Sequence, residues 1–314
     1  MKAYTGIDKE YWHVTYKQDK NSKHYGEGPE IGLVQEYLKK SHSPLLHAFL
    51  QLPIFYPKVR EVANSFGLGK QGNYYHEQYD NDQAKIIFSG FGYLDSDDFF
   101  VYAKILQLLD RNNAHTLEIH ENDLMKECGY KSRDLYRDRK SRLRTTIQRL
   151  SCIGGLTLRK GVEPIPEMDN YDCMSFKLLP QHSFCVKTKT YHFEIDQGLF
   201  FAYAFLQSWQ TIDLDLYAQI RGSAAKILYL FIESKFNRNN IHQTKVNFRR
   251  DTLAHRLGYV SRNMATKDMT KGVKVALDSL VRTGYLSNYE KVMTDRNNPT
   301  YHIYPASINL KGTS

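Results

Sequence analysis

The pentapeptide RNNAH at Arg111–His115 occurs a second time, with one substitution, as RNNIH at Arg238–His242. The same tetrapeptide, AKIL, precedes both copies, at Ala103–Leu106 and at Ala225–Leu228. Two short matches in the same order suggest that a longer segment of the chain is duplicated. The segments that follow the pentapeptides test this interpretation.

The downstream segments LEIHENDLMKECGY (Leu117–Tyr130) and VNFRRDTLAHRLGY (Val246–Tyr259) both end in Gly-Tyr. Further on, RLSCIGGL and SLVRTGYL share a leucine, a glycine and a final leucine. Because the order never breaks, we infer a duplicated unit of roughly 110 to 130 residues, longer than the roughly 50 residues of a solenoid repeat and typical of a domain.

Composition agrees with two globular domains. The chain has 314 residues, of which 41% are hydrophobic and 13% aromatic, enough for about two cores. No apolar stretch approaches the length of a membrane helix, and the start, MKAYTGIDKEYWHV, lacks the apolar core of a signal peptide. We therefore expect a cytoplasmic protein. The cysteines have no paired spacing, which favours reduced thiols over zinc or disulfides; they are Cys128, Cys152, Cys173 and Cys185.

Signatures of an enzyme are missing from the sequence. There is no GxxxxGK[ST] motif for a P-loop and no His-x-His pair for a metal-dependent replication nickase. The Asn-Asn pairs of the repeated pentapeptides are typical of turns. Asp95, Asp97 and Asp98 offer metal ligands, but capping of a helix that begins near Ser96 explains them more simply, with Ser96 as the capping residue. We predict no catalytic site, no cofactor and no metal.

Each repeat contains the same succession of elements. A long apolar helix is followed by a short strand, a short helix ending at Gly-Tyr, a second helix and finally strands. In the second helix of the first repeat, Leu143, Ile147 and Leu150 form one apolar stripe. Its counterpart in the second repeat is Val273, Ala276, Leu277 and Leu280. Residues 64–83 have the composition of a long loop.

This succession predicts an α+β fold of two tandem winged-helix domains, each a helix-turn-helix followed by a β-hairpin wing. We expect a polar N-terminal arm over residues 1–46, a first winged-helix domain over 47–205 and a second over 206–314. The helix after Gly-Tyr then occupies the position of a recognition helix, which helix-turn-helix proteins place in the major groove of DNA.

Charge supports a nucleic-acid partner. The formal net charge is +9, and residues 131–149 alone carry eight Lys or Arg against two Asp. Many charge runs are only solvated faces, but this run shares a helix with an apolar stripe in the recognition position. We predict DNA contacts, mainly to phosphates, from Lys131, Ser132, Arg133, Arg137, Arg139, Lys140, Arg142 and Arg144.

The second repeat has fewer charges and more polar side chains at the corresponding place, a mixture suited to reading base edges. Two arginines begin the preceding short helix, where they can clamp phosphates, and three residues decorate the wing. The predicted DNA-binding residues of this repeat are Arg249, Arg250, Ser261, Arg262, Asn263, Lys267, Lys271, Lys274, Lys291, Arg296 and Asn297.

The chain resembles plasmid replication initiators, most closely the TrfA-type group of iteron-binding Rep proteins. The similarity is carried, in order, by QLPIFYP, FSGFGYLDSDDFFVYAKILQLL, LMKECGYKSRD, LRTTIQRL, FEIDQGLFFAYA and IDLDLYAQIRGSAAKILYLFIES. It implies two winged-helix domains that bind direct repeats at a plasmid origin, help to melt adjacent DNA and recruit host replication proteins such as a helicase or the host initiator. It also implies a bacterial, plasmid-associated location and an equilibrium between monomer and dimer. A dimeric winged-helix transcription regulator and a protein-interaction module remain alternatives.

The peptide QLPIF (Gln51–Phe55) is similar to the QLxLF peptides with which bacterial proteins dock on the replicative sliding clamp. Extended apolar peptides with two or three anchors do bind grooves in this way. The alternative is a buried strand of the domain. The residues of this candidate clamp-binding site are Gln51, Leu52, Ile54 and Phe55.

Overall fold

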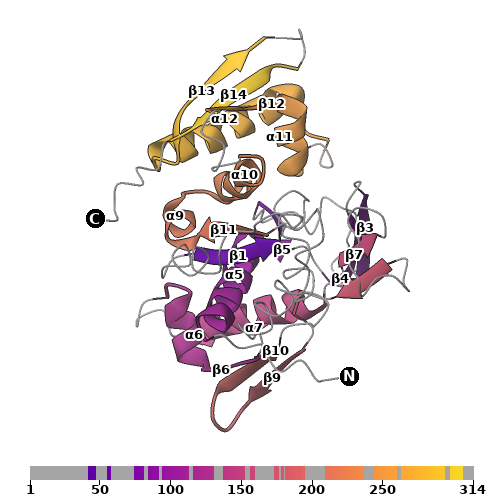
Figure 1. Ribbon diagram of the computed structural model, residues 1–314, viewed down its shortest axis with the longest axis vertical. Coiled ribbons are helices and arrows are strands. Elements are labelled where there is room, and N and C mark those ends of the chain that lie inside the picture. Colours follow the sequence, from indigo (N-terminus) through magenta and orange to yellow (C-terminus); the bar gives the residue numbers. More distant parts are fainter. Residues whose placement is uncertain are drawn as a thin grey trace, which may run out of the picture. The chain divides into compact units, whose positions relative to one another are not determined.

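The computed structural model (Figure 1) divides by its internal contacts into two compact units. The first unit comprises residues 1–48 and 72–211, and the second comprises 49–71 and 212–314. None of the described helices is long and apolar enough to span a membrane. The structure describes residues 42–46, 55–57, 74–80, 84–91, 94–112, 116–130, 137–152, 156–159, 173–176, 178–179, 181–194, 209–236, 244–259, 263–293 and 298–306.

The second unit contains four helices and a three-stranded sheet among its described residues. The strands are antiparallel and lie in the order β12-β14-β13, so the last strand of the chain is the middle one. The hairpin of β13 and β14 (yellow in Figure 1) packs beside α12. The elements are β2 (Phe55–Tyr56), α9 (Leu214–Gln219), α10 (Ser223–Glu233), β12 (Val246–Arg249), α11 (Arg250–Arg256), α12 (Thr266–Arg282), β13 (Leu286–Val292) and β14 (Thr300–Pro305).

The first unit has a corresponding three-stranded antiparallel sheet in the order β6-β10-β9. It also has a four-stranded antiparallel sheet in the order β3-β4-β7-β8. Its elements are β1 (His42–Leu46), β3 (Tyr74–Asp80), β4 (Ala84–Phe91), β5 (Leu94–Asp95), α5 (Ser96–Arg111), β6 (Thr116–His120), α6 (Glu121–Glu127), α7 (Arg137–Cys152), β7 (Leu156–Arg159), β8 (Cys173–Phe176), β9 (Gln181–Cys185) and β10 (Thr190–Glu194). Strand β11 (Trp209–Asp213) crosses the boundary between the units.

Both units therefore follow the same order: helix, strand, short helix, longer helix and a terminal hairpin. The first unit runs α5, β6, α6, α7, β9, β10 with β7 and β8 inserted after α7, and the second runs α10, β12, α11, α12, β13, β14. In each three-stranded sheet the first strand pairs with the last, and the middle strand in sequence lies at the edge. The mixed α+β architecture with small antiparallel sheets that the sequence predicted is confirmed.

The predicted apolar stripes form the cores of the two units. Leu143, Ile147 and Leu150 of α7 are buried, and α7 packs against α5. In α12 all four stripe residues are buried, and this helix packs against α10. Burial of such side chains removes apolar surface from water, each contributing about 1.5–3 kcal/mol.

The Gly-Tyr pairs end α6 and α11 in the same way. Gly129 and Gly258 have φ values of 78° and 68°, in the left-handed region that favours glycine. The amide of Tyr130 donates to the Met125 carbonyl at 3.0 Å, and that of Tyr259 donates to the Ala254 carbonyl at 2.9 Å. The two short helices therefore end with the same backbone geometry in both units.

Two local expectations from the sequence were wrong. Within the expected loop of 64–83, residues 74–80 form β3, which pairs with β4 from Tyr74 opposite Phe91 to Asp80 opposite Lys85. The polar, glycine-rich composition of this segment concealed the strand, although its partner β4 follows only three residues later. Helix α5 is capped by Asp95 and not by Ser96: the Asp95 carboxylate accepts the amide hydrogens of Asp97 and Asp98 at 2.8 and 3.1 Å.

Candidate nucleic-acid interface

Helix α12 presents three lysines on the face opposite its buried stripe. Lys267, Lys271 and Lys274 are exposed, and none of them forms an ion pair with another described residue. Asn263 lies exposed just before the helix, with a φ of 49°. The residue before the first turn of α12, Ala265, has no polar side chain with which to cap the helix. This end of the helix therefore combines free cations with backbone amides, both of which attract phosphate.

The two arginines that the sequence suggested as phosphate clamps meet at the junction of β12 and α11 and differ in exposure. Arg249 is exposed at the end of β12 and remains available. Arg250 is buried, and its guanidinium donates to the Asp251 carboxylate at 2.9 and 2.6 Å. Its guanidinium is thus engaged inside the fold, and a DNA contact by Arg250 stays a prediction. Lys291 is exposed on β13 of the hairpin.

In the first unit, some of the cations on the basic helix α7 are engaged in ion pairs within the domain. Arg139 and Arg142 are exposed without an ion pair to any described residue. Arg144 instead donates from Nε and Nη2 to the two carboxylate oxygens of Glu121 at 2.8 and 3.2 Å. The Lys140 ammonium lies 3.6 Å from the same carboxylate. Of the four predicted phosphate contacts on α7 whose side chains are described, two therefore face an internal acid.

Glu121 is the first residue of α6, and its side chain is only 1% exposed. The guanidinium of Arg144 also stacks on Phe184 of the hairpin, with 4.7 Å from Cζ to the ring centroid. Hydrogen bonding to Glu121 raises the pKa of Arg144. Burial raises the pKa of the neighbouring Tyr191 hydroxyl to about 12, and the Glu121 charge acts in the same direction. The cluster ties α6, α7 and the β9–β10 hairpin together.

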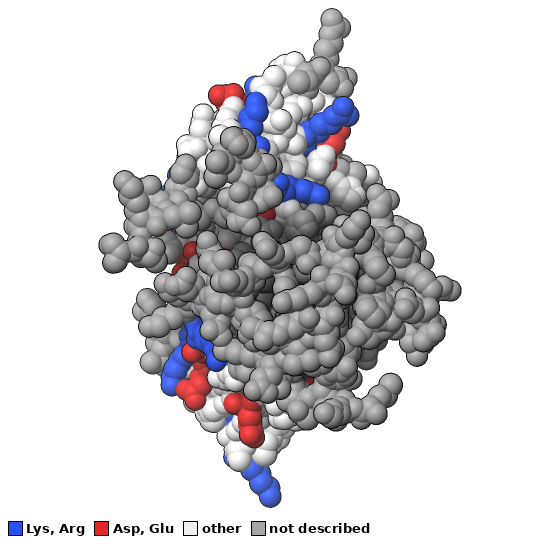
Figure 2. Space-filling model, viewed as in Figure 1, with Lys and Arg blue, Asp and Glu red and all other residues white. Residues whose placement is uncertain are grey.

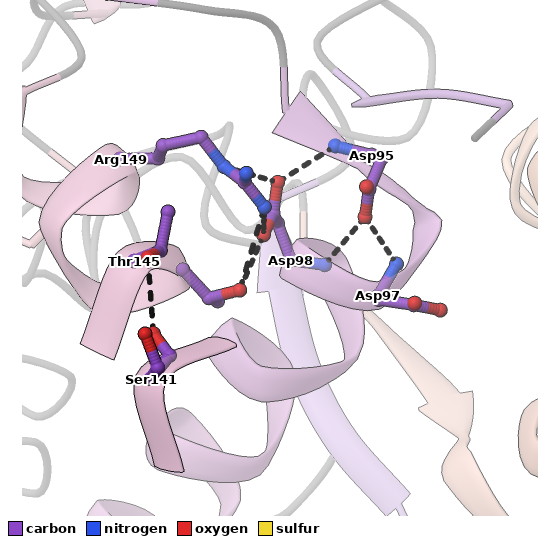
Figure 3. A network of polar contacts seen from close by, with 7 residues as sticks. Asp95, Asp97, Asp98, Ser141, Thr145 and Arg149 are labelled. Atoms are coloured by element: carbon purple, nitrogen blue, oxygen red, sulfur yellow. Dashed lines mark hydrogen bonds and ion pairs between the residues drawn. The ribbon is translucent and has the colours of Figure 1, made fainter. Parts of the chain in front are cut away.

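A second internal ion pair fixes α7 on α5 (Figure 3). The Asp98 carboxylate accepts hydrogen bonds from the Thr146 hydroxyl at 2.7 Å and from Arg149 Nε at 3.0 Å. It also accepts the Asp95 amide at 2.9 Å, which completes a reciprocal capping arrangement with Asp95. Burial raises the pKa of Asp98, and Arg149 opposes this shift. The acids at this helix start thus hold the fold together.

In the second unit, the corresponding contact between the longer helix and the start of α10 is a hydrogen bond between uncharged groups. The Ser279 hydroxyl of α12 donates to the Arg221 carbonyl, just before α10, at 2.6 Å. When the buried stripes of α7 and α12 are aligned, Ser279 takes the position of Arg149. A polar side chain at the same aligned position therefore bonds α7 to the start of α5 and α12 to the residues just before α10.

The hairpin tip of the first unit carries two cations that sequence reasoning missed. Lys187 and Lys189 lie exposed in the turn that joins β9 to β10. In the sequence, CVKTKTY continues the alternation of the flanking strands, which hides the turn. Two lysines alternating between aromatic residues of neighbouring strands could have indicated an exposed, basic hairpin turn.

The burial of Phe55 argues against the hypothesis that QLPIF is a clamp-docking peptide. Phe55 lies in β2 with 0% of its surface exposed, and β2 packs against α10. A docking peptide needs its aromatic anchor free to enter a groove on the partner, whereas Phe55 is part of the core. Gln51, Leu52 and Ile54 lie outside the described residues.

Figure 2 shows Lys and Arg side chains on the described surface of each unit, interleaved with acidic ones. Several predicted DNA contacts cannot be placed on this surface. The side chain of Arg137, at the start of α7, is not described. The remaining predicted residues lie outside the described ranges: Lys131, Ser132, Arg133, Ser261, Arg262, Arg296 and Asn297.

Comparison with known proteins shows that the fold of this chain is similar to that of solved structures. No protein-family model and no curated protein matches the sequence. The crystal structure of domains 2 and 3 of RctB is similar over 82% of this chain and 98% of that chain, with 12% identity and a TM-score of 0.53. A Pi initiator protein in complex with iteron DNA matches over 68% of this chain and 94% of that chain, with 9% identity and a TM-score of 0.44. At these identities, the RctB match shows a shared fold alone, and the Pi match falls below the level at which it carries an argument.

Proposed function

We propose that the chain is an initiator of plasmid replication that binds direct repeats of double-stranded DNA through two tandem winged-helix domains. The observation that carries this proposal is the duplication of one element order, with an exposed basic helix in the recognition position of each copy. The net charge of +9 supports an anionic partner. The step from DNA binding to replication initiation rests on the sequence resemblance to iteron-binding initiators and on the likeness of fold.

In this proposal the second domain, residues 206–314, reads the sequence of the repeat. Helix α12 enters the major groove with Lys267 and Lys271 toward the bases, because both lie near its N-terminal end on the exposed face. Lysine can donate to the guanine acceptors O6 and N7. Asn263, Arg249 and Lys291 flank this helix and contact the DNA backbone or nearby base edges.

The first domain, residues 47–205, then acts mainly on the DNA backbone. Arg139 and Arg142 are the free cations of α7, and Lys187 and Lys189 extend from the hairpin. Phosphate contacts of this kind fix register but carry little sequence information. The chain acts by binding alone: it positions origin DNA for opening and recruits host replication proteins, without catalysing a reaction. The free chain exchanges between monomer and dimer, and one monomer occupies each repeat.

The decisive experiment compares three DNA targets. Direct repeats of roughly 20 base pairs, about two helical turns, are sought in the DNA that flanks the gene. One repeat, a scrambled duplex and an inverted pair of half-repeats are then titrated by fluorescence anisotropy, with stoichiometry from native mass spectrometry. Preference for the direct repeat with one chain bound supports an initiator. A stable dimer on the inverted pair would identify a transcription regulator, and equal affinity for all three would refute sequence-specific recognition.

Two variants test the division between the domains. Replacing Lys271 with alanine should cost roughly 1–3 kcal/mol of binding free energy on the cognate repeat and much less on scrambled DNA. Replacing Arg142 with alanine should weaken binding to both duplexes equally and lower the log–log salt slope by about 1. Lys126, paired with Asp123 at 2.8 Å on α6, provides the control substitution. The reverse pattern would exchange the roles of the two helices.

A further inference from the structure

We infer that Glu121 is an internal counter-ion that withholds Arg144 and Lys140 of α7 from DNA phosphates, so that the first domain binds DNA with fewer charges than its sequence carries. This inference rests on the proposed DNA-binding function. It begins with the position of Glu121, whose carboxylate is 1% exposed and faces the helix that carries the basic run.

The carboxylate depends on the two cations, because water does not reach it. Arg144 supplies a two-point contact at 2.8 and 3.2 Å, and Lys140 lies at 3.6 Å. A buried charge that loses its partner remains without solvent to compensate it. Arg144 therefore cannot turn toward a phosphate without leaving Glu121 poorly compensated, even though its own side chain is 49% exposed.

The ring of Phe184 reinforces this arrangement. It lies 4.7 Å from Arg144 Cζ, and a guanidinium stacked on an aromatic face is stabilised by the ring quadrupole. The carboxylate on one edge and the ring on one face together hold Arg144 against the body of the domain. Of the α7 cations whose side chains are described, Arg139 and Arg142 then remain for DNA.

The second unit provides an internal comparison. In the alignment of the duplicated segments, Glu121 corresponds to Arg250, and both begin their short helices with buried side chains. The charge is reversed, and Arg250 pairs with its neighbour Asp251. Aligning the stripes of α7 and α12 matches Arg144 with Lys274, which is exposed and has no ion pair among the described residues. Glu121 is thus the residue by which the first unit, with its restrained Arg144, differs from the second unit, with its free Lys274.

The experiment uses the full-length chain and a fluorescent duplex of arbitrary sequence, titrated at several salt concentrations. Glu121→Gln keeps the shape of the side chain and removes its charge. Each cation it releases should add about 0.9 to the log–log salt slope, which corresponds to about eight-fold tighter binding at 0.1 M salt. Glu127→Gln is the matched control, because it removes the same charge from the same helix, where Glu127 meets Arg111 at 3.5 Å.

A second variant keeps the test decisive if Glu121→Gln disturbs folding. In Glu121→Gln/Arg144→Gln both partners become neutral, so no buried charge is left without its partner. Circular dichroism melting confirms that each variant is folded. The double variant should exceed the wild-type salt slope by about 0.9, because Lys140 is released while Arg144 is lost, whereas a fall of about 0.9 below the wild type would mean that Arg144 already contacts phosphate.

The outcomes separate the inference from the proposed function. A wild-type chain that fails to bind duplex DNA refutes both. Binding by the wild type, with equal effects of Glu121→Gln and Glu127→Gln, refutes only the counter-ion role. Weaker binding by Glu121→Gln than by the wild type also overturns it, since Glu121 would then support Arg144 as a DNA contact.

Discussion

Asp98 joins α5 to α7, and its replacement by alanine should strongly destabilise the first unit. The carboxylate is fully buried and accepts hydrogen bonds from Thr146, Arg149 and the Asp95 amide. Removing one partner of a buried ion pair costs roughly 3–5 kcal/mol. Arg149 keeps 30% of its side chain exposed and can regain some water, so we expect the lower end, about 3 kcal/mol. Part of this loss comes from the helix cap.

Urea unfolding followed by circular dichroism measures the effect. With a slope of about 2 kcal/mol per molar urea, the midpoint of the first unit should fall by about 1.5 M. The two units can unfold separately, so Leu277→Ala, in the core of the second unit, identifies the other transition. Asp98→Ala combined with Arg149→Ala should cost less than the sum of the single changes, by about 1–3 kcal/mol. Strict additivity, or an equal loss in the exposed control Asp97→Ala, would refute the reasoning.

Three further outcomes are expected. Phe55→Ala should destabilise the second unit by about 3–5 kcal/mol in thermal melting, because the ring is fully buried; an unchanged melting temperature would restore QLPIF as a docking peptide. Gly129→Ala should cost about 1–2 kcal/mol in the same assay, since a Cβ meets no atom within 4 Å and only the positive φ opposes it, while Gly129→Asn should cost less. With iodoacetamide at pH 8, peptide mapping should find Cys185 modified long before Cys128. Hydrogen bonding to Thr188 lowers the pKa of the exposed Cys185 thiol, and burial raises that of Cys128 to about 12, which reduces its thiolate about a thousand-fold. Comparable rates would contradict the burial of Cys128.

The order of elements in both units could be predicted from the sequence because local patterns determine it. An apolar stripe at helical spacing located α7 and α12, and the Gly-Tyr pairs located the reversals before them. Duplication strengthened each prediction, since a pattern seen twice is less often accidental. The cap of α5 was misplaced by one residue, because Asp95 and Ser96 are both good capping types.

The candidate interface was less accessible to sequence analysis. Counting lysines and arginines treats every cation as free, whereas Arg144 meets an acid 23 residues earlier and Arg149 meets one 51 residues earlier. These pairs form only when the helices pack, and helical periodicity does not reveal them. The pairing of β4 with β7 escaped prediction for the same reason, because these strands lie far apart in the sequence.

The order of strands in the two three-stranded sheets has a consequence for biosynthesis. In each sheet the strand made last, β10 or β14, is the central one and bonds to both of its neighbours. As the ribosome adds residues in order, β6 emerges long before β10, and β12 before β14. Until then their backbone edges are unpaired, a state in which nascent chains aggregate or pair wrongly. A premature stop or a proteolytic cut just before Thr300 would therefore remove the middle of the second sheet and leave two strands with nothing to join them.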